Sequence, residues 1–158
     1  MNTLLLQLRK LYSGAAKLAS YLQSPFLLFV RLYWGIQLSL NGWGKLHHLD
    51  KVTDFFTSLG IPAPGATATF VSTFEFLAGI LLVLGLASRL VGLMLTVDML
   101  VAYITADREA LLSFVSDPDK FTAGAEYTLL FAGLIILIFG PGLIALDTVI
   151  DRYFAKRL

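Results

Sequence analysis

Four long apolar stretches dominate the pattern of hydrophobic and polar positions along the chain. They cover residues 26–44, 66–86, 90–106 and 127–146 and are separated by shorter polar segments. An α-helix rises about 1.5 Å per residue and the hydrocarbon core of a bilayer is roughly 30 Å thick, so stretches of this length are typical of membrane-spanning helices. The pattern therefore predicts an all-α fold, a four-helix transmembrane bundle.

The residues before the first apolar stretch follow a different pattern, in which apolar side chains recur at steps of four and three. The apolar positions are Leu4, Leu8, Leu11, Ala15, Leu18 and Leu22, and the basic ones are Arg9, Lys10 and Lys17. This spacing is typical of an amphipathic helix in the membrane interface. A signal peptide is disfavoured because its basic residues would precede the leucine run. We therefore predict an interfacial segment over residues 1–23 and a four-span domain over residues 24–158, divided at Ser24-Pro25.

The polar segments carry weaker structural signals. The helical spacing of Val52, Phe55, Phe56 and Leu59 predicts a short surface helix, and the glycines and prolines of residues 60–65 predict a rigid turn after it. Residues 107–126 are expected to form a polar loop. Gly140-Pro141-Gly142 predicts a kink or an end in the fourth span.

Composition supports the bilayer as the solvent. The chain is 57% hydrophobic and 15% charged, whereas an average soluble domain is about 45–50% apolar and about 25% charged. A soluble enzyme and a disordered chain are both disfavoured. The net charge of +1 argues against nucleic acid as a partner, because nucleic acid binding requires a strongly basic face.

The side chains that commonly hold metals and cofactors are scarce. The chain has no cysteine, and its two histidines, His47 and His48, are neighbours. Thiolate metal sites and dithiol relays are therefore excluded. Two neighbouring histidines also cannot ligate one haem iron from two different helices in the usual manner. We expect no metal and no cofactor bound covalently or by evident ligands.

The distribution of lysine and arginine predicts the orientation in the membrane. The termini and the turn between the second and third spans carry Arg9, Lys10, Lys17, Arg89, Arg152, Lys156 and Arg157, and the opposite side carries Lys45, Lys51, Arg108 and Lys120. The positive-inside rule then places both termini in the cytoplasm, with Arg89 as a topology determinant. The expected location is a bacterial inner membrane.

Three charged residues, Arg31, Glu75 and Asp98, fall inside the predicted spans. A charge at the centre of a span costs about 2.5–3.5 kcal/mol on insertion scales, so such groups usually face a partner or a cavity. We expect Arg31 to pair with Glu75, with Asp98 as a second acceptor. Two interpretations remain: the charges are counter-ions that specify helix packing, or they line a pocket that binds a headgroup, a quinone or a small anion or relays protons.

The neighbours of these charges extend the candidate site. Gly35, Gly42 and Lys45 share a helical stripe with Arg31, and Gly79 shares a face with Glu75, so another helix can approach these faces closely. Asn41 lies beside the stripe, and Trp34 lies about one turn beyond Arg31. The candidate polar site consists of Arg31, Trp34, Asn41, Lys45, Glu75 and Asp98.

Other polar and aromatic residues near the span ends have simpler interpretations. Lys45, His47 and His48 are interpreted as a solvated interfacial cluster, and Tyr33, Trp43, Tyr103 and Tyr127 as an aromatic belt. Glu126 could pair with Lys45 or could simply be a carboxylate at a helix start.

An ordered set of residues then resembles the DoxX family of small four-span membrane proteins. The set consists of Arg31, Asn41-Gly42-Trp43-Gly44-Lys45-Leu46, Phe55, Gly60-Ile61-Pro62, Glu75, Gly79, the run from Leu81 to Arg89, Met99 and Ala102. The resemblance covers residues 26–139. It marks Arg31, Lys45, Glu75 and Arg89 as family-pattern positions without a known role. It implies a membrane subunit of a thiosulfate:quinone oxidoreductase or association with another membrane redox complex.

The sequence hypothesis is therefore a membrane or quinone-contacting subunit of a redox system. In this hypothesis quinone is the ligand, a redox protein is the partner, and the catalytic residues are not identified in this chain. The alternative is a non-enzymatic membrane anchor or a small carrier of an anion or lipid. The sequence leaves homo-oligomerisation open.

Overall fold

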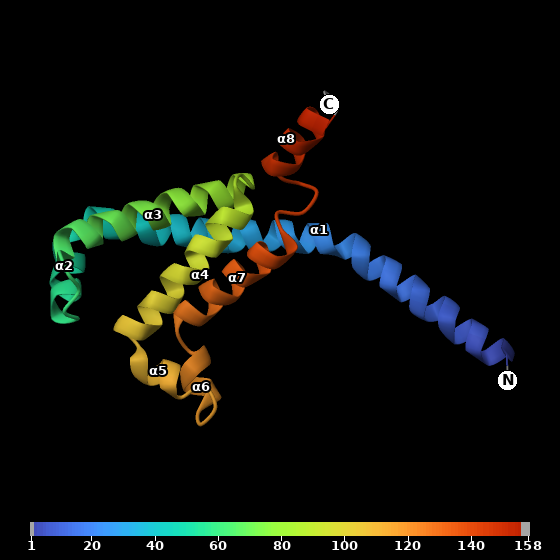
Figure 1. Ribbon diagram of the computed structural model, residues 1–158, viewed down its shortest axis with the longest axis horizontal. Helices are drawn as coiled ribbons and strands as arrows, with labels where there is room; N and C mark the ends of the chain where they lie inside the picture. The colour runs from blue at the N-terminus through green and yellow to red at the C-terminus, as the bar shows by residue number, and fades with distance from the viewer. Residues whose placement is uncertain (1, 156–158) are drawn as a thin grey trace.

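The computed structural model describes the backbone of residues 2–155 and the side chains of residues 5–155. Within that range the chain is all-helical and contains no strand, which confirms the predicted all-α class. The eight helices are α1 (Asn2–His47), α2 (Leu49–Ser58), α3 (Pro64–Leu84), α4 (Ser88–Thr105), α5 (Arg108–Leu112), α6 (Pro118–Thr122), α7 (Ala125–Phe139) and α8 (Leu146–Ala155) (Figure 1).

Two helix pairs build the molecule. The second half of α1 lies along α3, and α4 lies along α7; the pairs meet near the turn between α3 and α4 and diverge toward α2, α5 and α6 (Figure 1). Apolar side chains from both pairs form one core, which contains Val30, Leu38, Ala78, Leu82, Val91, Leu95, Met99, Leu129, Ala132 and Ile136. A single core therefore joins α1, α3, α4 and α7.

Small residues let the helices of each pair approach closely. A Cβ added to Gly35 would lie 2.9 Å from the carbonyl oxygen of Gly79, so any larger residue would push α1 away from α3. In the other pair, a Cβ added to Gly92 would lie 3.0 Å from the carbonyl oxygen of Gly133. Close approach of this kind is common between membrane helices.

Within the described residues, two helices are long and apolar enough to cross a membrane, α3 with 21 residues and α4 with 18. They coincide with the second and third predicted spans. Helix α7 is apolar but has only 15 residues. The helix in the predicted fourth stretch, residues 127–146, begins at Ala125 and ends at Phe139, which confirms the predicted end at Gly140-Pro141-Gly142. Gly140 has φ = +78° and Gly142 has φ = +79°, a left-handed region that favours glycine and stops the helix.

The helix continues through Ser24-Pro25, the predicted boundary of the interfacial segment, because α1 is one helix of 46 residues with Pro25 inside it. Proline removes one helical hydrogen bond, but the leucine residues on both sides of it, Leu22, Leu27 and Leu28, favour the helix. Figure 1 shows α1 bending where it leaves the other helices, so that its first half projects from the molecule.

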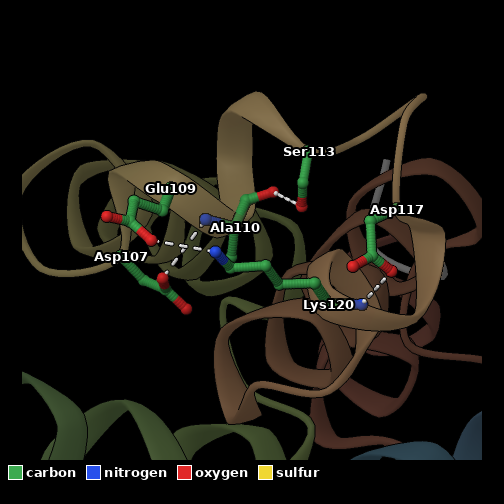
Figure 2. Close-up of polar contacts among 6 residues, drawn as sticks. All are labelled: Asp107, Glu109, Ala110, Ser113, Asp117 and Lys120. Atoms are coloured by element: carbon green, nitrogen blue, oxygen red, sulfur yellow. Dashed lines mark hydrogen bonds and ion pairs between the residues drawn. The ribbon is translucent and has the colours of Figure 1, made fainter.

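The segment expected as a polar loop over residues 107–126 contains α5 and α6 instead. Asp107 accepts a hydrogen bond from the Ala110 amide and Asp117 from the Lys120 amide, and each aspartate caps a helix N-terminus (Figure 2). Tyr103 is buried rather than in an aromatic belt, since its hydroxyl donates to the Phe121 carbonyl oxygen over 2.6 Å. The two short helices form a folded cap at the end of the α4–α7 pair.

Candidate functional site

A cavity of about 510 Å³ lies between the two helix pairs and is the candidate site. It is lined by residues of α1, α2, α3, α4 and α7, most of them apolar. Its polar members are Asn41, Lys45, Thr67, Glu75, Asp98, Thr105 and Glu126. Ligand pockets in proteins commonly have volumes of about 300–1,000 Å³, apolar walls and a few polar groups, and this cavity has all three features.

An ion pair between α1 and α3 forms part of the cavity wall. The Lys45 ammonium donates a hydrogen bond to Glu75 Oε1 over 2.6 Å. Glu75 is only 3% exposed, whereas the Lys45 side chain is 38% exposed. The pair forms because α1 approaches α3 closely one turn before Lys45: a Cβ added to Gly42 would lie 2.8 Å from the Ser72 carbonyl oxygen.

Carboxylates outnumber cations in the cavity. Asp98 reaches it from α4 and lies within electrostatic range of both Glu75 and Lys45. Asp98 Oδ2 and Glu75 Oε2 are both buried, and neither has a hydrogen-bond partner among the described residues. Glu126 adds a third carboxylate at the start of α7, so the lining carries three carboxylates and one ammonium.

Arg31 lies elsewhere, so the predicted ion pair between Arg31 and Glu75 is wrong. Lys45 lies 14 positions further along α1, a rise of about 21 Å, and takes the place at Glu75 that the sequence analysis gave to Arg31. Arg31 is 1% exposed and its guanidinium Nη2 donates to the Ile144 carbonyl oxygen. A Cβ added to Gly85, at the end of α3, would collide with the Arg31 guanidinium.

The contacts of Arg31 belong to a second polar region, which we call the Arg31 junction and define by Arg31, Gly85, Ile144 and Asp147. Asp147 is close enough to act electrostatically on Arg31. Its carboxylate also accepts hydrogen bonds from the amides of residues 87 and 88, over 2.7 and 2.8 Å, and so caps α4. The junction thus connects α1, α3, α4 and α8.

Side chains at and beside the junction also bond to part of the backbone of residues 140–145, which lie between α7 and α8. The Leu143 amide donates to Ser24 Oγ over 2.8 Å, and the Thr148 hydroxyl donates to the Gly142 carbonyl oxygen over 2.7 Å. With Arg31 on the Ile144 carbonyl, side chains replace the hydrogen bonds that a helix would supply here.

The structure therefore brings together four of the six predicted site residues, Asn41, Lys45, Glu75 and Asp98. Arg31 is at the junction, and Trp34 packs against the core. Arg89 is exposed at the start of α4, near Gly140. The described residues contain no group of three or more histidine, aspartate or glutamate side chains that could hold a metal ion.

Sequence reasoning missed the contribution of α2 to the cavity. The predicted surface helix exists, but its residues Phe55 and Phe56 line the cavity, followed by Leu59 directly after the helix and by Ile61 and Pro62 of the turn. The spacing of the aromatic residues was a signal of this contribution, because an amphipathic helix packs its apolar face against other apolar side chains.

Comparison with known proteins places these residues in a family. The DoxX family model matches residues 26–108, a range that contains Asn41, Lys45, Glu75 and Asp98. The chain belongs to the DoxX family. A Bacillus subtilis (strain 168) protein named "Putative oxidoreductase CatD" is 28% identical over 120 residues, which cover 76% of this chain and 83% of that relative. No solved structure matches the chain.

Proposed function

We propose that this DoxX-family protein spans the membrane four times, through α1 from Pro25 onward, α3, α4, and α7 with residues 140–145. The shared core of these four helices supports the proposal. Helix α7 alone rises about 22 Å, less than the roughly 30 Å of the hydrocarbon core. Residues 140–145 extend this span, and irregular backbone is tolerated at membrane depth where protein groups satisfy it, as Ser24 and Arg31 do here.

In the proposed orientation both termini lie in the cytoplasm of a bacterial inner membrane, as the lysine and arginine distribution favours. The absence of cysteine allows a direct test with single-cysteine variants. In intact cells, a membrane-impermeant maleimide should label Asp54→Cys and Asp117→Cys, whereas Ser13→Cys and Asp151→Cys should react only after permeabilisation. The reverse labelling would overturn the orientation, and labelling of Asp54→Cys and Asp117→Cys from different sides would overturn the four spans.

We further propose that the protein is the quinone-contacting membrane subunit of a redox system. The observation that carries this proposal is the cavity, whose apolar walls suit a lipophilic ring and whose few polar groups, among them the Lys45 ammonium as a hydrogen-bond donor, suit the oxygens of its head. The name of the Bacillus subtilis relative supports the redox assignment. The excess of carboxylates disfavours the anion-carrier alternative.

The roles in this proposal are divided between two proteins. Lys45, Glu75 and Asp98 would hold and orient the ring, and a bound quinone would supply two-electron acceptor chemistry. A partner protein would bring the electrons, so this chain is a non-catalytic subunit of the oxidoreductase.

Quinone extraction tests the proposed function. The protein is purified in native-like lipid, extracted with organic solvent and analysed for quinone. We expect quinone in the wild-type extract and its loss in Ala102→Phe, which fills the cavity from α4. Val97→Phe is the matched control, because Val97 lies on the same helix, is half exposed and does not line the cavity. If the wild-type extract contains no quinone, or if Ala102→Phe retains as much quinone as the control Val97→Phe, the proposal is contradicted and the non-enzymatic anchor is favoured.

A further inference from the structure

The unpartnered buried atoms of the cavity are hydrogen-bond acceptors. Glu75 Oε2 and Asp98 Oδ2 are buried without a donor among the described residues. The nearest cation, the Lys45 ammonium, already donates to Glu75 Oε1 over 2.6 Å. Neither the Lys45 ammonium nor the Asn41 amide in the lining donates to these two oxygens, so the oxygens lack a donor, and a bound molecule that supplies hydroxyl groups would satisfy them.

From this we infer that the cavity binds the reduced, dihydroxy form of a quinone more tightly than the oxidised form. The inference rests on the proposed function and adds which redox form the site prefers. The carbonyl oxygens of an oxidised quinone only accept hydrogen bonds, so they would face the Glu75 and Asp98 oxygens without a hydrogen between them. The two hydroxyl groups of the reduced form can donate to those oxygens.

The size of the preference follows from the cost of unsatisfied buried groups. Hydrogen bonds to charged groups are stronger than bonds between neutral groups, and a buried acceptor left without a donor is unfavourable. One such bond, made by the reduced form and missing in the oxidised form, corresponds to at least a tenfold difference in Kd. For a two-electron couple, a tenfold preference raises the midpoint potential of the bound pair by about 30 mV.

Other donor molecules fit the cavity less well. An organic cation would also complement the carboxylates, but it would meet the Lys45 ammonium in the same wall. Most of the lining is apolar, including Phe55, Phe56 and Leu59, which suits a neutral aromatic ring better than a small hydrophilic solute. A neutral aromatic diol satisfies both the acceptors and the apolar walls.

The test compares the two redox forms of one short-chain quinone. Ubiquinone-1 and ubiquinol-1 are titrated calorimetrically into the protein in lipid nanodiscs at pH 8, which favours ionised carboxylates, with the quinol kept reduced by dithionite under anaerobic conditions. The chain has no cysteine, so the reductant has no disulfide to break. We expect ubiquinol-1 to bind at least tenfold more tightly.

An isosteric variant identifies the atom responsible. Asp98→Asn replaces a carboxylate oxygen by an amide nitrogen that donates, so the ratio of the two Kd values should fall at least threefold. Asp50→Asn is the matched control, because Asp50 is exposed on α2 and does not line the cavity; its ratio should equal that of the wild type.

Each outcome has one meaning. If both forms bind with equal affinity, or the quinone binds more tightly, the inference fails and the proposed function stands. If neither form binds, the proposed function itself fails. If Asp98→Asn leaves the ratio unchanged, Asp98 is not the acceptor. Should that variant fail to fold, the wild-type ratio alone decides the inference.

Discussion

The two buried polar regions of this protein differ in what their charged groups contact. At the Arg31 junction, Arg31 and Asp147 bond to backbone groups that the helices leave free, at the Ile144 carbonyl and the start of α4. In the cavity, Glu75 and Asp98 keep oxygens without a partner next to open volume. Arg31 Nε and Nη1 also lack a hydrogen-bond partner among the described residues, but Arg31 does not line the cavity, whereas Glu75 and Asp98 do. The comparison teaches that a buried charge in a membrane helix can complete the fold or face a ligand, and that open volume beside its unpartnered atoms distinguishes the two roles.

The largest expected effect is at the junction, where Gly85→Ala would place a Cβ against the Arg31 guanidinium. Gly85 also has φ = +69°, which a non-glycine residue adopts only at a cost. Strain and overpacking together should lower the free energy of unfolding by about 3 kcal/mol or more. Thermal denaturation in detergent, followed by circular dichroism, measures the effect.

Gly44→Ala is the matched control for that substitution. Gly44 lies in α1, and an added Cβ would meet nothing within 4 Å. Alanine favours a helix over glycine by about 1 kcal/mol, so this variant should be as stable as the wild type or more stable. Equal stability of Gly85→Ala and Gly44→Ala would show that the close contact at Arg31 does not matter.

The next effect concerns the cavity, where Lys45→Met leaves the buried Glu75 carboxylate without its cation. Breaking a fully buried ion pair costs about 3–5 kcal/mol, and partial exposure of Lys45 reduces the expected loss to about 2 kcal/mol. The double variant Lys45→Met/Glu75→Gln should recover much of this stability, because Glu75 no longer carries the charge that Lys45 neutralised. Denaturant unfolding in detergent measures both. A double variant less stable than Lys45→Met would contradict the pairing.

A smaller effect tests whether the Arg31 junction contributes to stability without contributing to quinone binding in the cavity. Asp147→Ala removes the cap of α4 and the carboxylate that acts electrostatically on Arg31, and should lower stability by about 1 kcal/mol or more, because the loss of an N-terminal cap alone usually costs that much. Because Asp147 does not line the cavity, the amount of bound quinone should stay at the wild-type level. Loss of quinone in a folded Asp147→Ala variant would mean that the two regions do not act separately.

The smallest effect lies outside both regions, in the cap of α5 and α6 that Figure 2 shows. The Lys120 ammonium donates to Glu109 Oε2 over 2.9 Å, and this bond lowers the pKa of Glu109 below its ordinary value of 4.5. A lowered carboxyl pKa adds stability above the ordinary value, and the gain is lost as the pH falls through the lowered value. In Lys120→Met, carboxyl NMR titration should show the Glu109 pKa rising toward 4.5. An unchanged pKa would show that the pair does not form in solution.

Hydropathy predicted the helical class and the positions of α3 and α4, because length and apolar content alone decide them. The sequence could not reveal the partner of Arg31. That partner is a backbone carbonyl, which is free only because α7 ends at Phe139 and residues 140–145 leave the helix. The partner of Glu75 was equally hidden, since it depends on the close contact that Gly42 allows between α1 and α3.

The cavity was predictable only in part. Lys45, Glu75 and Asp98 stand out in a sequence because charges are rare in apolar stretches. The aromatic residues of α2 do not stand out in this way, because apolar side chains are common and only the tertiary fold places them over the cavity. Gly92 and Gly133, which bring α4 against α7, were missed for the same reason.

Photolabelling with an azidoquinone tests the central claim, that the cavity rather than the Arg31 junction binds the ligand. The labelled protein, in native-like lipid, is digested and the modified residues are located by mass spectrometry, with excess unmodified quinone as the competitor. We predict competed label within residues 55–75 and 98–106, the two ranges that contain most of the cavity lining. Competed label confined to residues 24–31 and 140–147, at the junction, would contradict the account.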